Sequence, residues 1–250
     1  MASPKIKNMD MPSEKIGKLF VISTPIGHLD DITFRAVEIL KSVDRIAAED
    51  TRRTKLLLKK YNIAKPLISY HDFNKEKRAP SIIQHILCGE SIALVSDAGT
   101  PGVSDPGYRL IRNAIDECIP VIPIPGPSAI LTGLSASGLP TDRFVFEGFM
   151  EARGSRREKQ IEMLKEEERT IVMFESPYRI LKSMEAILNI MGNRQICVAR
   201  ELTKIYEEWI RGDVKEVLDQ LKKRKGIKGE ITLIIQGKGK RAKKGKDPIS

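Results

Sequence analysis

The chain has 250 residues, of which 41% are hydrophobic and 30% are charged; this balance excludes a disordered protein and predicts a folded one with a sizeable core. No apolar stretch approaches the length of a membrane span, and the first 18 residues lack the apolar core of a signal peptide, so we expect a cytoplasmic protein with no membrane partner. The formal net charge of +10 favours a polyanionic partner such as nucleic acid, although the lysine-rich segment 238–250 supplies part of that charge.

Short apolar runs alternate with helical patterns from Lys18 onward. The predicted strands cover 19–22, 45–48, 67–70, 91–95 and 121–124, and the predicted helices lie between them at 31–42, 54–58, 77–88 and 108–111. Strands that alternate with helices predict a mainly parallel sheet covered on both faces. We therefore predict an α/β domain over residues 18–124, preceded by a flexible extension over 1–17.

The pattern changes after a rigid Pro-Gly-Pro segment at 125–127 and a small-residue helix at 128–137. Strands are predicted at 144–146, 170–174, 196–199 and 231–235, and helices at 178–191 and 214–224. The charged segment 203–212 is an additional strand or a hairpin arm. Because only some of these strands are separated by helices, we predict a second α/β domain with a mixed sheet over 125–237, followed by a disordered basic tail over 238–250.

The loop after the predicted strand 91–95 reads Ser-Asp-Ala-Gly-Thr-Pro-Gly-Val-Ser-Asp-Pro-Gly over residues 96–107. Connections from strand to helix usually have about two to six residues, and this one is longer and richer in Gly, Pro and Asp. Gly permits backbone angles closed to other residues, and Pro makes the path rigid. Ligands of open α/β sheets lie beyond the carboxyl ends of the strands, so we interpret this loop as a ligand site rather than an ordinary connection.

Four other segments lie just beyond predicted strands, at 23–31, 48–53, 125–129 and 174–177. Those of the first domain would meet at one edge of a parallel sheet. Motifs for dinucleotides (GxGxxG), for a P-loop (GxxxxGK[ST]) and for a nucleophile elbow (GxSxG) are absent. The cysteines Cys88, Cys118 and Cys197 are far apart, which argues against a disulfide framework and a structural zinc site.

The five segments (Thr-Pro-Ile-Gly, Ala-Glu-Asp-Thr-Arg, Ser-Asp-Ala-Gly-Thr-Pro with Ser-Asp-Pro-Gly, Pro-Gly-Pro-Ser-Ala and Phe-Glu-Ser-Pro) together resemble the tetrapyrrole methylase superfamily. More narrowly, they resemble its branch that methylates ribose 2′-hydroxyls in small-subunit ribosomal RNA, and this likeness alone suggests a cytidine. The resemblance covers residues 18 to 236. It implies two α/β domains with S-adenosylmethionine in the cleft between them, and a homodimer.

The resemblance also implies which residues hold the cofactor. They are Pro25, Asp97, Gly99, Thr100, Pro101, Pro127, Ser128, Ala129, Met173 and Phe174. Asp97 would accept hydrogen bonds from cofactor hydroxyl or amino groups, or would instead cap its own loop. We expect no metal, because the sulfonium already makes the methyl group electrophilic, and catalysis would rest on in-line placement and exclusion of water.

A general base for the ribose hydroxyl is not fixed by the sequence. Glu49, Asp50 and His71 are candidates by type and place, but Glu49 and Asp50 could equally cap the next helix and hold Arg52, and His71 could simply end a strand. Phe73 stands where the family commonly has a second His, so we do not expect a catalytic pair of histidines there.

Arginine clusters are the candidates for RNA phosphates. Thr51, Arg52 and Arg53 open a predicted helix, Arg153, Arg156 and Arg157 are predicted to form a basic loop, and Arg179 opens another helix. Each cluster alone is better explained as solvated surface, but together the clusters would form a track for RNA phosphates. The substrate expected from the resemblance is small-subunit ribosomal RNA, naked or in an assembled subunit. Methylation of a tetrapyrrole precursor and a non-catalytic RNA-binding role stay open as alternatives.

Overall fold

The structure, a computed structural model, describes residues 16–239. Most of the predicted N-terminal extension (1–15) and of the predicted basic tail (240–250) lie outside the described residues. The chain divides into two compact units. The N-terminal unit contains the chain up to Thr24 together with Ile32–Gly126, and the C-terminal unit contains Pro25–Asp31 and the chain from Pro127 onward.

The sheet of the N-terminal unit is entirely parallel and has the order β3-β2-β4-β1-β5. Its strands are β1 (Leu19–Ile22), β2 (Arg45–Ala48), β3 (Leu67–Ser69), β4 (Ile92–Val95) and β5 (Val121–Ile124). Its helices are α1 (Phe34–Ser42), α2 (Thr51–Lys60), α3 (Lys75–Leu87) and α4 (Gly107–Asp116). The predicted parallel α/β sheet is confirmed.

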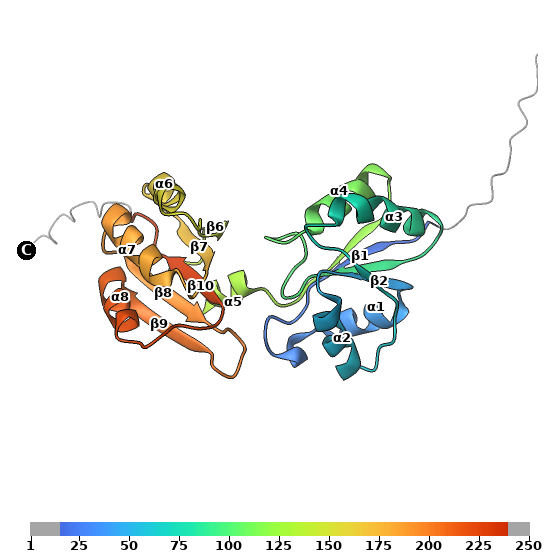
Figure 1. Ribbon diagram of the computed structural model, residues 1–250, viewed down its shortest axis with the longest axis horizontal. Helices are drawn as coiled ribbons and strands as arrows, with labels where there is room; N and C mark the ends of the chain where they lie inside the picture. The colour runs from blue at the N-terminus through green and yellow to red at the C-terminus, as the bar shows by residue number, and fades with distance from the viewer. Residues whose placement is uncertain (1–15, 240–250) are drawn as a thin grey trace, which may run out of the picture. The chain divides into compact units, whose positions relative to one another are not determined.

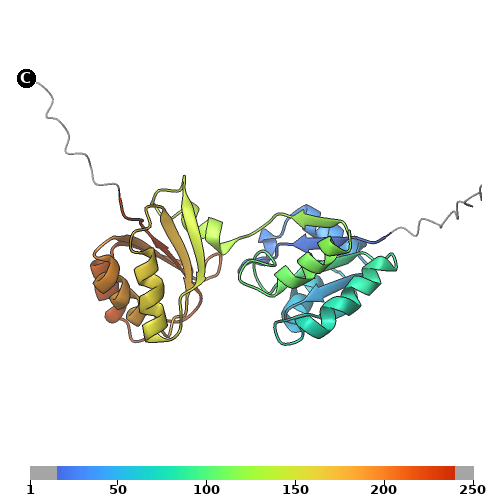
Figure 2. The ribbon, with the colours of Figure 1, turned by 90° about the horizontal axis from the view of Figure 1, so that it is seen from above.

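Helices cover both faces of this sheet, α1 and α2 on one side and α3 and α4 on the other (Figure 1, Figure 2). Successive residues of β2 show why both faces need cover: Ile46 and Ala48 pack toward α1 and α2, while Ala47 packs toward α3 and α4. Strands that are buried on both faces have continuous apolar sequences rather than alternating ones. This explains why short apolar runs were sufficient to locate them.

The C-terminal unit has a mixed sheet with the order β6-β7-β10-β8-β9, in which only β6 and β7 are parallel. Its elements are α5 (Ala129–Ser135), β6 (Phe144–Phe149), α6 (Gly154–Leu164), β7 (Thr170–Glu175), α7 (Ile180–Met191), β8 (Gln195–Arg200), β9 (Glu208–Asp213), α8 (Val214–Lys222) and β10 (Ile231–Ile235). Helices α6, α7 and α8 pack on one face, and α5 and Ile26 pack on the other. The predicted mixed sheet is also confirmed.

Helix α6 corrects the prediction of a basic loop. Its buried residues, Arg157, Ile161 and Leu164, follow a helical spacing, but the first of them is an arginine, so the apolar pattern is too short to indicate a helix. The predicted helix at 31–42 begins later, at Phe34, because Thr33 is its N-cap and accepts a hydrogen bond from the amide of Ala36 (3.1 Å). Within residues 16–239, no helix has both the length and the apolar character required to cross a bilayer.

Candidate active site

Four loops follow the neighbouring parallel strands β2, β4, β1 and β5 and therefore begin at the carboxyl edge of the N-terminal sheet. The loops after β1 and β4 are joined directly: Thr24 and Gly99 each donate a backbone N–H to the other's carbonyl, at 2.9 and 3.0 Å. The hydroxyls of Ser23 and Thr100 add a hydrogen bond of 2.8 Å between the same two loops. Gly99 has a φ of 81°, in the left-handed region that favours glycine, so the bridge depends on this residue type.

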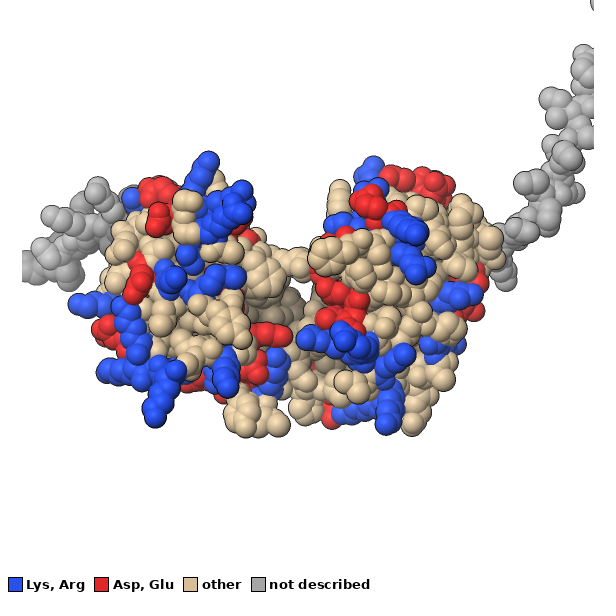
Figure 3. Space-filling view, in the orientation of Figure 1, with Lys and Arg blue, Asp and Glu red and all other residues tan. Residues whose placement is uncertain are grey.

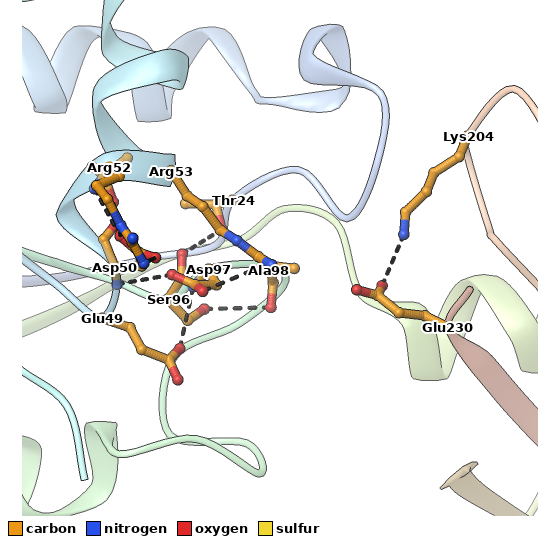
Figure 4. Close-up of polar contacts among 11 residues, drawn as sticks. Thr24, Glu49, Asp50, Arg52, Arg53, Ser96, Asp97, Ala98, Lys204 and Glu230 are labelled. Carbon is orange, nitrogen blue, oxygen red and sulfur yellow. Dashed lines mark hydrogen bonds and ion pairs between the residues drawn. The ribbon is translucent and has the colours of Figure 1, made fainter. Parts of the chain in front are cut away.

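Asp97 joins the loop after β4 to the loop after β2 (Figure 4). Its carboxylate accepts a hydrogen bond from the backbone amide of Asp50 (2.9 Å) and lies 3.5 Å from a guanidinium nitrogen of Arg53. Its own backbone amide donates to the carboxylate of Glu49 at 3.4 Å. The side chain of Asp97 is still one-quarter exposed, so it can organise this edge of the sheet and also meet a ligand.

Asp105 shapes the second half of the same loop. Its carboxylate accepts hydrogen bonds from the backbone amides of Gly102 (2.5 Å) and Gly107 (3.1 Å), and burial raises its pKa. A Cβ atom at Gly107 would lie 2.5 Å from the backbone nitrogen of Gly102. The tight turn into α4 therefore requires both the carboxylate and the glycine, which explains the Ser-Asp-Pro-Gly sequence.

Glu49 and Asp50 are adjacent carboxylates in different surroundings. Asp50 caps α2 through the amide of Arg52 (2.8 Å) and accepts two further hydrogen bonds from the guanidinium of Arg52, at 3.0 and 2.8 Å. These contacts hold the pKa of Asp50 well below its usual range. Burial raises the pKa of Glu49, and the negative charge of Asp97 adds to this effect. Of the two, Glu49 has the greater proton affinity.

His71 is held in place by Asn74. The Asn74 side chain accepts the backbone N–H of His71 (2.9 Å), donates to the carbonyl of Ser69 (3.1 Å), and its amide nitrogen lies 3.1 Å from Nε2 of His71. With the amide nitrogen as donor, Nε2 is the acceptor and the ring proton is on Nδ1. The lone pair of Nε2 then accepts the Asn74 hydrogen bond and is not free to take a proton from a substrate, so His71 is a poorer candidate for a base than Glu49.

The remaining cofactor candidates lie in the C-terminal unit. Ser128 is the N-cap of α5, Ala129 is the first residue of that helix, and Pro25 is buried. Met173 is only 1% exposed and packs in the core beneath α6 and α7, which leaves its side chain no free surface. Phe174 is half-buried between the rings of Phe146 and Phe149, with centroids at 5.1 and 5.2 Å.

The arginine candidates differ in accessibility. Arg52, Arg53, Arg153 and Arg156 are exposed. Arg157, in contrast, is 6% exposed and donates to the hydroxyl of Ser183 (3.3 Å), which in turn donates to the buried carboxylate of Glu175. The expectation that Arg157 belongs to an exposed basic loop is wrong, because it supports the core of the C-terminal unit.

Arg179 forms an ion pair with Glu175 at 3.4 Å and is one-third exposed. Thr51 begins α2, where the free backbone N–H groups of a helix start favour an anion. Within residues 16–239, no three His, Cys, Asp or Glu side chains gather in a way that would hold a metal ion.

Residues 18–218 match the family model of Tetrapyrrole (Corrin/Porphyrin) Methylases. The chain belongs to this family. Among its curated relatives is a Thermotoga maritima protein named Ribosomal RNA small subunit methyltransferase I, 47% identical over 89% of this chain and 100% of the relative. A protein of the same name from Bacillus subtilis is 46% identical over 89% of this chain and 76% of the relative.

Solved structures of distant sequence share the fold of this tetrapyrrole methylase family member. A diphthine synthase superposes with a TM-score of 0.67 at 13% identity, over 88% of this chain and 90% of that one. A uroporphyrin-III C-methyltransferase from Thermus thermophilus, solved with S-adenosyl homocysteine, gives 0.62 at 14% identity, over 87% and 97% of the two chains. At such identities the likeness extends to the fold alone and does not identify a substrate for this chain.

Proposed function

We propose that this chain is an S-adenosylmethionine-dependent methyltransferase of small-subunit ribosomal RNA, and that it methylates the 2′-hydroxyl of a cytidine ribose. The observation that carries the proposal is the 47% identity across the full length of a relative named as a small-subunit ribosomal RNA methyltransferase. The resemblance of the five segments to the ribose-methylating branch supports the finer assignment. The same proposal includes a cytoplasmic homodimer in which each chain has two domains, residues 18–124 and 125–237. Its substrate would be naked ribosomal RNA or an assembled small subunit.

The carboxyl edge of the N-terminal sheet fits such a cofactor. The bridge between Thr24 and Gly99 places a loop without bulky side chains there, so backbone groups can approach a ligand closely. Asp97, Gly99, Thr100 and Pro101 would hold the cofactor from this unit. Pro25, Pro127, Ser128, Ala129, Met173 and Phe174 would contribute from the C-terminal unit; for Met173 this contribution is limited to the backbone.

The bound sulfonium supplies an electrophilic methyl group, and the chain's own residues have to place the ribose hydroxyl in line with it and exclude water. Glu49 is the proposed acceptor of the hydroxyl proton, because its half-buried carboxylate has a raised pKa and, among the residues that the structure describes, accepts a single hydrogen bond, from the backbone amide of Asp97. Asp50 would act differently, by holding Arg52 at the start of α2. Thr51, Arg52, Arg53, Arg153, Arg156 and Arg179 are the proposed phosphate contacts.

Transfer of a labelled methyl group from S-adenosylmethionine tests the reaction. Small subunits and naked ribosomal RNA from cells lacking the protein, and a tetrapyrrole precursor, are offered in parallel, and the labelled RNA is digested to nucleosides. We expect label in 2′-O-methylcytidine. Label in the tetrapyrrole alone would show that the substrate is a tetrapyrrole precursor and not RNA. Cofactor binding without any methyl transfer would favour a non-catalytic RNA-binding role.

A further inference from the structure

A basic surface begins on α2 and continues beyond the end of this helix. Residues 51–66 contain no acidic residue, and their basic residues are Arg52, Arg53, Lys55, Lys59, Lys60 and Lys65. Figure 3 shows that Lys and Arg side chains gather on the part of the N-terminal unit that α2 occupies. The candidate active site uses only the first turn of this helix, so the lysines that follow have no role in it.

These later lysines surround a groove of about 500 Å³, here named the α2 groove. It is lined by Lys55, Leu58, Lys59, Ile63, Ala64, Lys65 and Leu67. Ammonium groups and apolar side chains therefore meet in one depression, and no carboxylate lines it. An occupant that carries negative charge on one side and an uncharged, flat or apolar part on the other would complement such a surface.

Lys55, Lys59 and Lys65 have no ion pair with any residue that the structure describes. Lys55 and Lys59 are exposed and Lys65 is half-buried. Two lysines elsewhere in the N-terminal unit do pair with a carboxylate, Lys41 with Glu38 and Lys75 with Asp72. Mutual repulsion among three unpaired cations opposes their clustering, and a bound polyanion would remove this repulsion.

Helical spacing aligns the groove with the candidate active site. Arg52, Lys55 and Lys59 are three and four residues apart, so they follow one edge of α2, opposite the buried Leu57 and Thr54. Ten helical residues extend for about 15 Å. The row of basic side chains therefore runs from Arg52, in the first turn of α2, to the groove at the other end of the helix.

We propose that the α2 groove binds the sugar-phosphate backbone of the RNA segment that flanks the methylated nucleotide. The inference rests on the proposed function for the identity of the RNA. Phosphates would meet the ammonium groups of Lys55, Lys59 and Lys65, and a ribose or base would lie on Leu67, the half-buried apolar side chain of the groove. The repeated charge of RNA matches lysines one helical turn apart, and the apolar floor matches the uncharged part of a nucleotide.

The test compares Lys55→Ala/Lys59→Ala with the wild type, with Lys55→Arg/Lys59→Arg, and with the matched control Lys223→Ala/Lys225→Ala. The control removes the same charge from exposed lysines of the C-terminal unit that lack an ion pair among residues 16–239. Binding of naked ribosomal RNA is measured over a range of salt concentrations. Methyl transfer and S-adenosylmethionine affinity are measured on the same preparations.

We expect the alanine pair in the groove to weaken RNA binding about tenfold and to lower the slope of log Kd against log salt by about 1.4, roughly 0.7 for each phosphate that the variant no longer neutralises. KM for RNA should rise while kcat and cofactor affinity stay unchanged, and the arginine pair should bind as the wild type does. A slope and KM equal to those of the control would overturn the proposal.

The two proposals can fail separately in this experiment. If the wild type methylates ribosomal RNA but the alanine pair behaves as the control does, the groove is excluded and the proposed function stands. If the wild type transfers no methyl group while its salt slope still depends on Lys55 and Lys59, the groove stands and the proposed reaction is excluded.

Discussion

Glu49 and Asp50 show, at the scale of single residues, how two neighbouring carboxylates acquire different chemistry. Asp50 has three hydrogen bonds from Arg52, which stabilise the ionised form and lower its pKa. Glu49 is half-buried near Asp97; partial burial and the charge of Asp97 raise its pKa, although its carboxylate accepts one long hydrogen bond from the Asp97 amide (3.4 Å). A general base works best when its pKa is close to the working pH, which favours Glu49.

We therefore expect Glu49→Gln to lower kcat by about 10²- to 10⁴-fold. In the wild type, kcat should fall as pH drops through the raised pKa of Glu49, because the protonated carboxyl cannot accept the hydroxyl proton. This acidic limb of the pH profile should be absent in Glu49→Gln. The measurement is a pH profile of methyl transfer. Asp50→Asn, which keeps an oxygen to cap α2, should retain the limb, and a Glu49→Gln enzyme with the wild-type profile would exclude Glu49 as the base.

Helices α6 and α7 and strand β7 are connected, at the scale of secondary-structure elements, by a buried polar cluster. Glu175 is 3% exposed at the end of β7; it accepts the hydroxyl of Ser183 on α7 and pairs with Arg179. Arg157 of α6 reaches the same hydroxyl from the other side. The Phe-Glu-Ser-Pro segment next to the proposed cofactor residues is therefore fixed from two helices.

Replacing Glu175 by Gln should destabilise the C-terminal unit by about 1 to 3 kcal/mol, because the Ser183 hydroxyl and Arg179 would lose their shared carboxylate and the buried Arg157 would lose the negative charge next to its partner Ser183. Urea unfolding measures this free energy of unfolding. The double variant Arg157→Met/Glu175→Gln should recover part of the loss, since it removes the uncompensated charge as well. A single-variant loss below about 1 kcal/mol, with no recovery in the double variant, would show that the cluster is not a coupled network.

The proposed cofactor residues are, at the scale of the whole molecule, divided between the two units. Gly99 and Thr100 belong to the N-terminal unit, whereas Ala129 and Phe174 belong to the C-terminal unit. Residues so far apart in the chain can serve one ligand only if both units contact it. The residues whose amide hydrogen exchange slows when the cofactor binds therefore test the proposed set of cofactor-binding residues.

We expect S-adenosylmethionine at 100 times its Kd to raise the free energy of unfolding by about 2.7 kcal/mol. Amide hydrogen exchange should slow at Gly99 and Thr100 and also at Ala129 and Phe174. Exchange on the outer helix α8, in the same samples, serves as the internal control. Protection restricted to the N-terminal unit would reduce the cofactor site to Asp97, Gly99, Thr100 and Pro101.

The sequence alone determined the parallel and mixed sheets and the strands other than β9, whose charged segment it left as a strand or a hairpin arm. Strands buried on both faces leave continuous apolar runs, and the tight turns of the Asp97 loop require Gly and Pro. Only the tertiary structure decided the roles of charged residues. It assigned Arg157 to the core and gave Glu49 a raised pKa but Asp50 a lowered one. It also placed Lys55, Lys59 and Lys65 around one groove. The reason is physical: burial and charge partners depend on residues distant in the chain, and local sequence patterns do not record them.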